Sequence, residues 1–221
     1  MAALFERLRQ DASAEWEDYV GHDFVRGLGE GTLPKAAFQH YLVQDYLFLI
    51  EFARAYALGV SKAPTLADMR KAAGAMSAIL SEMNLHVRLC GEWGIDARTL
   101  EAAPPSRALL AYTSFVLEIG RRGDYLDLIV ALSPCVIGYA DIAVRLSQTT
   151  SGRDPANPYA AWIAEYSGEP YQALARDAQD EIDRIADTYL TEARYPRLLA
   201  IFRRATRLEA DFWQMGLAQS D

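Results

Sequence analysis

Residues 35–61 read KAAFQHYLVQDYLFLIEFARAYALGVS, and this stretch decides the fold class. Apolar side chains recur with the 3.6-residue period of an α-helix on almost every face of the segment, a pattern typical of a central, buried helix. Thr32 is a suitable N-cap, and Pro34 suits the first turn. We therefore predict a long central helix that runs to about Ser61.

Most of the remaining sequence repeats this helical period, and no segment shows the sustained alternation of a strand. Glycines, prolines and polar runs separate the periodic segments. We predict further helices over residues 4–19, 65–94, 106–120, 124–148, 158–168, 170–193 and 195–217, and a glycine-containing loop over 21–31. The simplest interpretation is an all-α protein, a single-domain helical bundle that spans residues 1–221.

Composition narrows the classes of partner and compartment. The 221 residues carry a net charge of -8, which disfavours binding to the phosphates of a nucleic acid. The most apolar stretch, residues 128–140, is shorter than the roughly 20 residues that span a bilayer. We therefore expect no nucleic acid partner and no membrane association. The expected compartment is the cytoplasm, where Cys90 and Cys135 stay reduced.

Two carboxylates stand where an apolar side chain is expected. Asp45 interrupts an aromatic stripe of the central helix, and Glu209 interrupts an apolar stripe of the last helix. The stripes are Phe38, Tyr41, Asp45, Phe48 and Phe52, and Leu198, Phe202, Ala205, Glu209 and Phe212. A carboxylate on a core-facing stripe is costly unless it is paired, protonated or beside a wet cavity.

A cysteine and three tyrosines occupy comparable inner positions. Cys135 and Tyr139 are four residues apart, so they share one face of a helix. Pro134 removes a hydrogen-bond donor and should kink that helix, which leaves room for a ligand. Tyr112 and Tyr166 lie on the inner stripes of other helices. If these faces converge, they enclose a cavity suited to a flat, polar, heteroaromatic ligand.

Each of these signals also has an ordinary structural explanation. A buried cysteine is more often inert than nucleophilic, and an inward tyrosine usually belongs to the core. The carboxylates could form structural ion pairs. The candidate partners are His40 and Arg54 for Asp45, and Arg203 and Arg207 for Glu209. The co-occurrence of two such carboxylates with a cysteine beside a helix kink favours a functional site.

A metal centre is not expected from the sequence. The di-iron sites of helical bundles need Glu-x-x-His pairs on facing helices, and His22, His40 and His86 belong to no such pair. A glycine-rich phosphate loop is also missing from the sequence. We therefore expect neither a metal nor a cofactor.

Eight short segments carry a resemblance to a known family. They are Gly31-Thr32-Leu33-Pro34, Gln44-Asp45-Tyr46, Ser133-Pro134-Cys135, Gly138-Tyr139, Asn157-Pro158-Tyr159, Trp162-Ile163 with Tyr166, Glu209, and Phe212-Trp213. In this order the chain resembles the TenA family, also called thiaminase II or aminopyrimidine aminohydrolase. None of the segments is specific alone, but the ordered set is, and it covers nearly the whole chain.

The resemblance implies an all-α fold like that of haem oxygenase, without haem, in a homotetramer. It implies hydrolysis of aminomethylpyrimidine, and of thiamin as a further candidate substrate, to hydroxymethylpyrimidine in thiamin salvage. The roles implied are nucleophile for Cys135, acid and base for Glu209, and recognition of the aminopyrimidine edge for Asp45. Substrate-binding roles are implied for Tyr112, Tyr139, Tyr166, Phe48 and Phe212.

Two positions depart from the family pattern, and two other functions are alternatives to the hydrolase. Phe48 stands where many members have a tyrosine, and Ile137 replaces a common aromatic residue, which affects the substrate more than the reaction type. The first rival is a non-catalytic pyrimidine-binding or regulatory protein, a transcriptional activator in name. The second is an oxygenase-like metalloprotein, which the missing Glu-x-x-His pairs disfavour.

Overall fold

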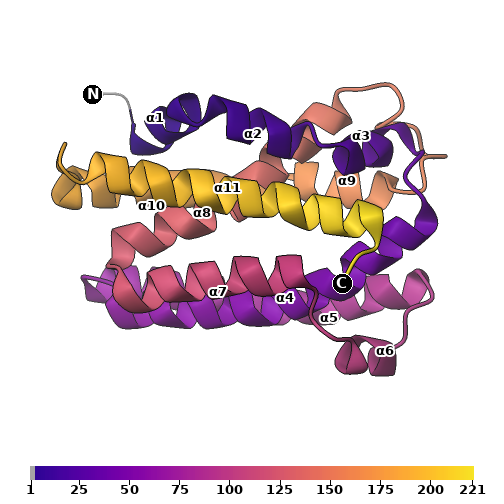
Figure 1. The fold of residues 1–221 in the computed structure, drawn as a ribbon, viewed down its shortest axis with the longest axis horizontal. Coiled ribbons are helices and arrows are strands. Elements are labelled where there is room, and N and C mark those ends of the chain that lie inside the picture. The colour runs from indigo at the N-terminus through magenta and orange to yellow at the C-terminus, as the bar shows by residue number, and fades with distance from the viewer. Residues whose placement is uncertain (1–2) are drawn as a thin grey trace. The chain divides into compact units, whose positions relative to one another are not determined.

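In the computed structural model the chain folds into α-helices joined by short turns and loops (Figure 1). The structure describes residues 3–221, with the side chains at positions 82 and 85 left out. The helices are α1 (Leu4–Asp11), α2 (Ser13–Val20), α3 (Asp23–Glu30), α4 (Lys35–Lys62), α5 (Leu66–Glu92), α6 (Ala97–Ala102), α7 (Arg107–Arg122), α8 (Tyr125–Ser147), α9 (Ala160–Ser167), α10 (Glu169–Tyr189) and α11 (Tyr195–Ala218). The described residues contain no strand, so the predicted all-α class is confirmed.

The helices belong to two compact units. The first unit contains the chain up to Pro34 together with Ile129–Gln214, and the second contains Lys35–Leu128 together with Met215–Asp221. Each unit is therefore built from two separate segments of the chain. Helix α8 begins in the second unit and continues into the first, whereas α11 begins in the first and ends in the second. The single domain remains a prediction.

Helix α4 is the centre of the second unit, as its nearly continuous apolar sequence predicts. It packs along α5 and α7 (Figure 1). Gly120 on α7 allows a close approach, because a Cβ there would lie 2.8 Å from Cδ1 of Leu58 on α4. Thr65 is the N-cap of α5, and its hydroxyl accepts from the backbone N–H of Asp68 at 3.2 Å.

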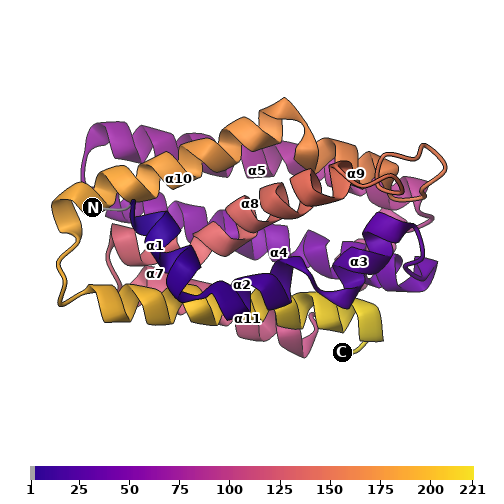
Figure 2. The same ribbon diagram turned by 90° about the horizontal axis from the view of Figure 1, so that it is seen from above.

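In the first unit, α1 and α9 both pack against α10 (Figure 2). The backbone N–H of Phe5, at the start of α1, donates to the carboxylate of Asp183 on α10 at 3.0 Å. The rings of Phe5, Trp16 and Phe202 then meet in pairs, with centroids 5.8 to 6.0 Å apart. These contacts fix α1, α2 and α11 around one apolar core.

The predicted loop over residues 21–31 was wrong, because most of it is helix α3. Phe24, Val25 and Leu28 are all buried, and their burial outweighs the low helix propensity of the glycines. Gly29 serves packing, since a Cβ there would lie 2.5 Å from Cδ2 of Leu146. The helix ends at Gly31, whose φ of 74° lies in the left-handed region that favours glycine.

Other boundaries differ from the prediction in smaller ways. The first predicted helix is interrupted at Ala12, which separates α1 from α2. Helix α6 was missed because only Leu100 of its six residues is buried, so its apolar period is too short to read. Helix α9 begins at Ala160 rather than at Pro158, and α10 ends at Tyr189 rather than near residue 193.

The late start of α9 follows from the contacts of Asn157. Its Nδ2 donates to the carbonyls of Leu28, Gly29 and Ser151 at 3.1 to 3.2 Å, and its Oδ1 accepts from the backbone N–H of Tyr159. The side chain therefore ties the loop before α9 to the end of α3. This tertiary role replaces the simple helix cap that its position before a proline predicts.

Within the described residues, α8 is the one helix long and apolar enough to cross a membrane by length and composition. Its apolar window is 83% buried inside the structure. A buried core helix passes the same test, so this is weak evidence for a membrane segment. The absence of a membrane partner stays a prediction.

Candidate active site

Cys135 lies in the middle of α8, directly after the proline that interrupts the helical hydrogen bonds. Because Pro134 has no N–H, it leaves the carbonyl of Val130 without its normal helical donor. The hydroxyl of Ser133 donates to that carbonyl at 2.9 Å and restores the lost bond. The Ser133-Pro134 pair thus lets a proline stand beside the cysteine in a continuous helix. The Cys135 side chain is half-buried, so a small molecule can reach it.

Tyr139, one turn after Cys135, lies among aromatic side chains of two other helices, α9 and α11. Its ring centroid is 5.2 Å from those of Tyr166 and Trp213, and 5.8 Å from that of Trp162. Trp162 and Tyr166 themselves are 4.6 Å apart on α9. The structure thus brings together Tyr139 and Tyr166, two of the predicted substrate-binding residues, in the first unit.

Glu209 lies on α11 one turn before Trp213, as Cys135 lies one turn before Tyr139 on α8. Helices α8 and α11 run in the same direction in Figures 1 and 2, and Tyr139 and Trp213 are in ring contact. Cys135 and Glu209 each precede one of these two contacting rings by one turn. That the thiol and the carboxyl face each other stays a prediction.

The apolar stripe around Glu209 is confirmed by its burial. Glu209 and Phe212 are each only 2% exposed. The suggested ion pairs of Glu209 with Arg203 or Arg207 were wrong. Both arginines lie against the carboxylate of Glu15 instead, Arg207 at 2.7 Å and Arg203 at 3.7 Å. Glu209 is thus a buried acid that does not serve as the structural partner of either arginine.

The second unit holds the other predicted residues, Asp45, Phe48 and Tyr112. Phe48 on α4 and Tyr112 on α7 have ring centroids 5.1 Å apart. Asp45 is buried one turn before Phe48, on the same face of α4. A carboxyl followed by two aromatic rings can hydrogen-bond the edge of a flat heterocycle and cover its face.

Asp45 is paired with a residue that the sequence analysis considered only as a metal ligand. Nδ1 of His86, on α5, lies 3.6 Å from Oδ2 of Asp45. Nε2 of His86 lies 3.0 Å from the carbonyl of Leu42, and because a carbonyl only accepts, Nε2 carries a hydrogen. The partners suggested earlier were wrong, since Arg54 pairs with Glu51 and His40 lies against the carbonyl of Ser220.

Burial controls the proton affinity of Asp45. It raises the pKa of this carboxyl from its ordinary value of 3.8 to about 6, and the opposing effects of His86 and a hydrogen bond from Tyr41 are smaller. His86 could have been found from the sequence by the same rule that found Asp45. It is a polar residue on the buried stripe of its helix, with Ile79 and Cys90.

Gln44 fixes the start of α7 relative to Asp45. Its amide donates to the carbonyl of Pro104 at 3.1 Å, and its Oε1 accepts from the backbone N–H of Ser106 at 2.9 Å. Both groups of the amide are thus used to hold the segment from which α7 begins. Gln44 therefore sets the position of Tyr112 against α4, a structural role that its sequence position did not reveal.

The two cysteines have different environments. Cys90 is fully buried, and burial together with the nearby charge of Asp45 raises its thiol pKa to about 12. A thiol with such a pKa stays protonated and unreactive near neutral pH. Cys135 is half-buried and lies beside the aromatic cluster of Tyr139. Of the two, Cys135 is the candidate nucleophile.

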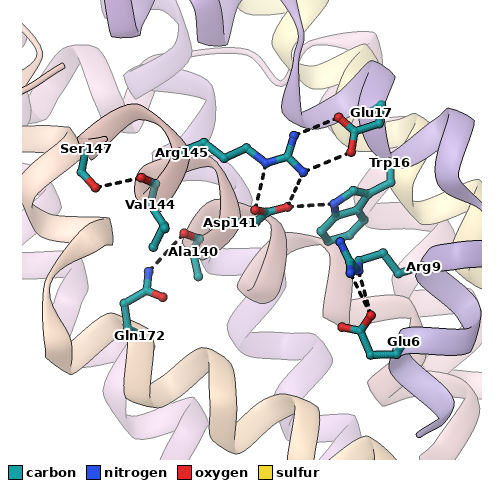
Figure 3. A network of polar contacts seen from close by, with 10 residues as sticks. All are labelled: Glu6, Arg9, Trp16, Glu17, Ala140, Asp141, Val144, Arg145, Ser147 and Gln172. Carbon is teal, nitrogen blue, oxygen red and sulfur yellow. Dashed lines mark hydrogen bonds and ion pairs between the residues drawn. The ribbon is translucent and has the colours of Figure 1, made fainter. Parts of the chain in front are cut away.

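A polar network anchors the other side of α8 to α2 (Figure 3). Asp141 accepts from Nε1 of Trp16 at 2.9 Å, and Arg145 bridges Asp141 and Glu17. Gln172 adds a link to α9, because its amide donates to the carbonyls of Ala140 and Tyr166 at 3.1 and 2.8 Å. The helix that carries Cys135 is thus held on both sides.

The candidate residues fall into one set in each unit. Cys135, Tyr139, Tyr166, Glu209 and Phe212 belong to the first unit, and Asp45, Phe48 and Tyr112 belong to the second. That both sets face one cavity stays a prediction. Among residues 3–221, apart from the two side chains left out, no three His, Cys, Asp or Glu side chains are grouped as metal ligands.

Comparison with known proteins identifies relatives along almost the whole chain. The model of the TENA/THI-4/PQQC family matches residues 9–219. A protein of Halalkalibacterium halodurans named aminopyrimidine aminohydrolase is 38% identical over 217 residues, which are 97% of this chain and 94% of that protein. A hydroxymethylpyrimidine/phosphomethylpyrimidine kinase of Saccharomyces cerevisiae is 31% identical, and the match covers 91% of this chain but 37% of the kinase.

Solved structures agree with these relatives. The crystal structure of a TenA family transcription regulator from Silicibacter is 43% identical, with a TM-score of 0.92 over 97% of this chain and 96% of that one. A domain of unknown function with a heme oxygenase-like fold from Shewanella denitrificans has a TM-score of 0.74 over 97% of this chain and 92% of that one, at 14% identity. The haem-oxygenase-like fold is therefore confirmed.

Proposed function

Because this chain belongs to the TENA/THI-4/PQQC family, we propose that it is an aminopyrimidine aminohydrolase of thiamin salvage with Cys135 as its nucleophile. The single observation that carries the proposal is the placement of the half-buried thiol. It lies one turn before Tyr139, whose ring contacts that of Trp213, the residue one turn after Glu209 on α11. A nucleophile, an acid and an aromatic surface on neighbouring helices meet the needs of this reaction.

The first step is addition of the Cys135 thiolate to an electron-poor carbon of the pyrimidine ring. A carbon–sulfur bond forms, and the displaced electron pair is held by the ring. That electron pair then expels the amine from the ring methylene. Glu209 donates a proton to the amine as its carbon–nitrogen bond breaks, so ammonia departs and an exocyclic double bond remains.

The second step returns the enzyme to its starting state. The oxygen of a water molecule adds to the exocyclic carbon, and Glu209 takes the released proton. The electron pair flows back through the ring, and the carbon–sulfur bond breaks to give the thiolate. The net change is aminomethylpyrimidine plus water to hydroxymethylpyrimidine plus ammonia.

Asp45 is proposed to recognise the aminopyrimidine edge. A neutral carboxyl can donate to a ring nitrogen while it accepts from the neighbouring amino group, which fixes orientation. The raised pKa of Asp45, about 6, supports this role because the carboxyl takes up a proton readily near neutral pH. Phe48, Tyr112 and Phe212 are proposed to contact the faces of the ring.

The likeness to part of a kinase supports hydroxymethylpyrimidine as the product. The yeast relative is named for phosphorylation of that pyrimidine, and this chain matches about a third of its length. A domain joined to such a kinase can supply the substrate that the kinase consumes. Thiamin is proposed as a second substrate, since its cleavage at the same methylene releases the same alcohol.

The test is ammonia release from aminomethylpyrimidine by the purified protein, with thiamin as a second substrate. We expect Cys135→Ser and Glu209→Gln each to lower kcat by about 100-fold or more, because each removes a group that forms or breaks a bond. Cys90→Ala is the matched control, since it removes the other thiol and should keep the activity. Full activity in either site variant would refute the assigned role.

We also propose a homotetramer in the cytoplasm, with small pyrimidines as the ligands. Exposed apolar side chains on α5, namely Leu66, Met69 and Leu80, support burial against another subunit. Light scattering of the purified protein tests the tetramer.

A regulatory role is the alternative that the name of the Silicibacter structure offers, and the net charge of -8 disfavours direct DNA contact.

A further inference from the structure

We propose that Tyr19, on α2, is a positioning residue that holds the Cys135 turn of α8 in register with the Glu209 turn of α11. This inference rests on the proposed function, because it assigns Cys135 and Glu209 the chemistry described above. Tyr19 is fully buried, and its place on the N-terminal helices gave no sequence signal for a role in the site.

The ring of Tyr19 occupies a notch that only a glycine leaves open. A Cβ at Gly138 would lie 2.3 Å from Cε1 of Tyr19 and 2.7 Å from its hydroxyl oxygen. Contacts that short do not occur between real atoms, so a side chain at 138 would displace the tyrosine. Gly138 is three residues after Cys135, and the ring therefore lies directly against the turn that carries the thiol.

The hydroxyl of Tyr19 binds the backbone of the same turn. It donates to the carbonyl of Pro134 at 3.3 Å in a buried environment. This carbonyl belongs to the peptide bond that joins Pro134 to Cys135. In this turn a side chain, that of Ser133, replaces the backbone donor that the proline lacks, and the donor from α2 adds a restraint on the Cα of Cys135.

The ring of Tyr19 also contacts the acid-bearing helix. Its ring stacks on that of Trp213, with centroids 6.3 Å apart and an interplanar angle of 17°. Trp213 follows Glu209 by one turn of α11. A single side chain thus contacts the helix of the thiol and the helix of the acid, and it sets the spacing between them.

Helix α2 is itself fixed along one face of α8. Pro134, Gly138, Asp141 and Arg145 recur every three or four residues, so they form one stripe. Tyr19 donates to the carbonyl of Pro134 and packs against Gly138. Trp16 and Glu17 bind Asp141 and Arg145, as Figure 3 shows. Cys135 and Tyr139 directly follow two residues of this stripe, Pro134 and Gly138, in the sequence. They therefore lie on the neighbouring face of α8. The anchoring face and the proposed reactive face are therefore adjacent and separate.

Tyr19→Phe tests the proposal because it keeps the ring in its notch and removes only the hydroxyl. Tyr159→Phe is the matched control. The Tyr159 hydroxyl, in the same unit, also donates to a buried carbonyl, that of Leu33, which does not belong to the Cys135 turn. The two variants should lose similar thermal stability, so a difference in activity reports on position.

Two readouts are measured on both variants and on the wild type. The first is kcat and KM for ammonia release, and we expect Tyr19→Phe to lower kcat about tenfold with little change in KM, because a small misplacement of reacting groups slows the chemical step. The second is the rate of iodoacetamide alkylation at Cys135, followed by mass spectrometry of its peptide. We expect this rate to rise about fivefold, as loss of one hydrogen bond loosens the turn.

The outcomes separate this proposal from the proposed function. Wild-type kcat in Tyr19→Phe, or an equal loss of kcat in Tyr159→Phe, would overturn the positioning role. A wild-type protein that released no ammonia would defeat the proposed function instead. The alkylation rates would still decide the role of Tyr19, because an unchanged rate at Cys135 in Tyr19→Phe would contradict it.

Discussion

Asp45→Asn should stabilise the folded protein at neutral pH while it removes the proposed activity. The substitution keeps the size of the side chain and removes its charge. Burial raises the pKa of Asp45 from 3.8 to about 6, which means that the folded protein resists ionisation of this carboxyl. At about 1.4 kcal/mol for each pH unit, full ionisation lowers the free energy of unfolding by about 3 kcal/mol.

The sign of the pH dependence follows from proton binding. In the unfolded chain Asp45 loses its proton near pH 4, whereas in the folded protein it does so near pH 6. Between these values the folded state binds more protons, so this group makes the wild type less stable as pH rises. The asparagine variant lacks this contribution. The difference between variant and wild type should therefore be small near pH 4 and approach about 3 kcal/mol at pH 7.5.

The assay is urea or thermal unfolding, followed by circular dichroism, at several pH values from 4 to 7.5. For a chain of this size, about 3 kcal/mol corresponds to a gain in Tm of roughly 6–12 °C at the upper end. Asp96→Asn is the control, because backbone and side-chain hydrogen bonds from Thr99 lower the pKa of Asp96, the opposite direction to that of Asp45. A difference between Asp45→Asn and wild type that stays constant with pH, or a less stable variant at pH 7.5, would refute the reasoning.

Three further substitutions test the contacts around the site. Gln172→Met keeps the volume nearly constant and removes the hydrogen bonds that link the carbonyl of Tyr166 to that of Ala140 on α8, so it should raise KM several-fold. Steady-state kinetics checks this, and an unchanged KM would contradict it. Asn157→Ala should cost about 1–3 kcal/mol of unfolding free energy by removing its buried hydrogen bonds to the carbonyls of Leu28 and Gly29, and a urea titration that shows no loss would count against it. Arg145→Ala should cost at most about 1 kcal/mol, with a smaller loss at high salt, because its ion pairs are partly exposed; a salt-independent loss would show that packing dominates.

Much of the fold could be predicted because its long helices have apolar periods that extend over many turns. Helices α4, α5, α7, α8 and α11 begin and end close to the predicted residues, and Thr65 and Ser106 cap α5 and α7. The errors are local. In α3 the glycines suggested a loop, but Gly29 is needed for contact with Leu146, a partner that lies far away in the sequence.

The candidate site could be predicted only in part. A carboxylate on an apolar stripe is visible in one helix alone, which is why Asp45 and Glu209 were found. The neighbours of these carboxylates come from other helices. For this reason His86 was missed as the partner of Asp45. For the same reason Arg203 and Arg207 were predicted to pair with Glu209, whereas they pair with Glu15. The proposed role of Tyr19 depends on the notch at Gly138, which exists only because two helices pack there. The apolar period of one helix does not show which side chain of another helix packs against it.

The fit between Tyr19 and Gly138 has a consequence for how this family can diversify. The two positions share one volume, so a substitution that enlarges position 138 is tolerated only where position 19 becomes smaller. Related sequences should therefore change at both places together or at neither. In the laboratory, substituting both residues together should lower the free energy of unfolding by less than the sum of the two single substitutions. A double-mutant cycle would measure this difference directly.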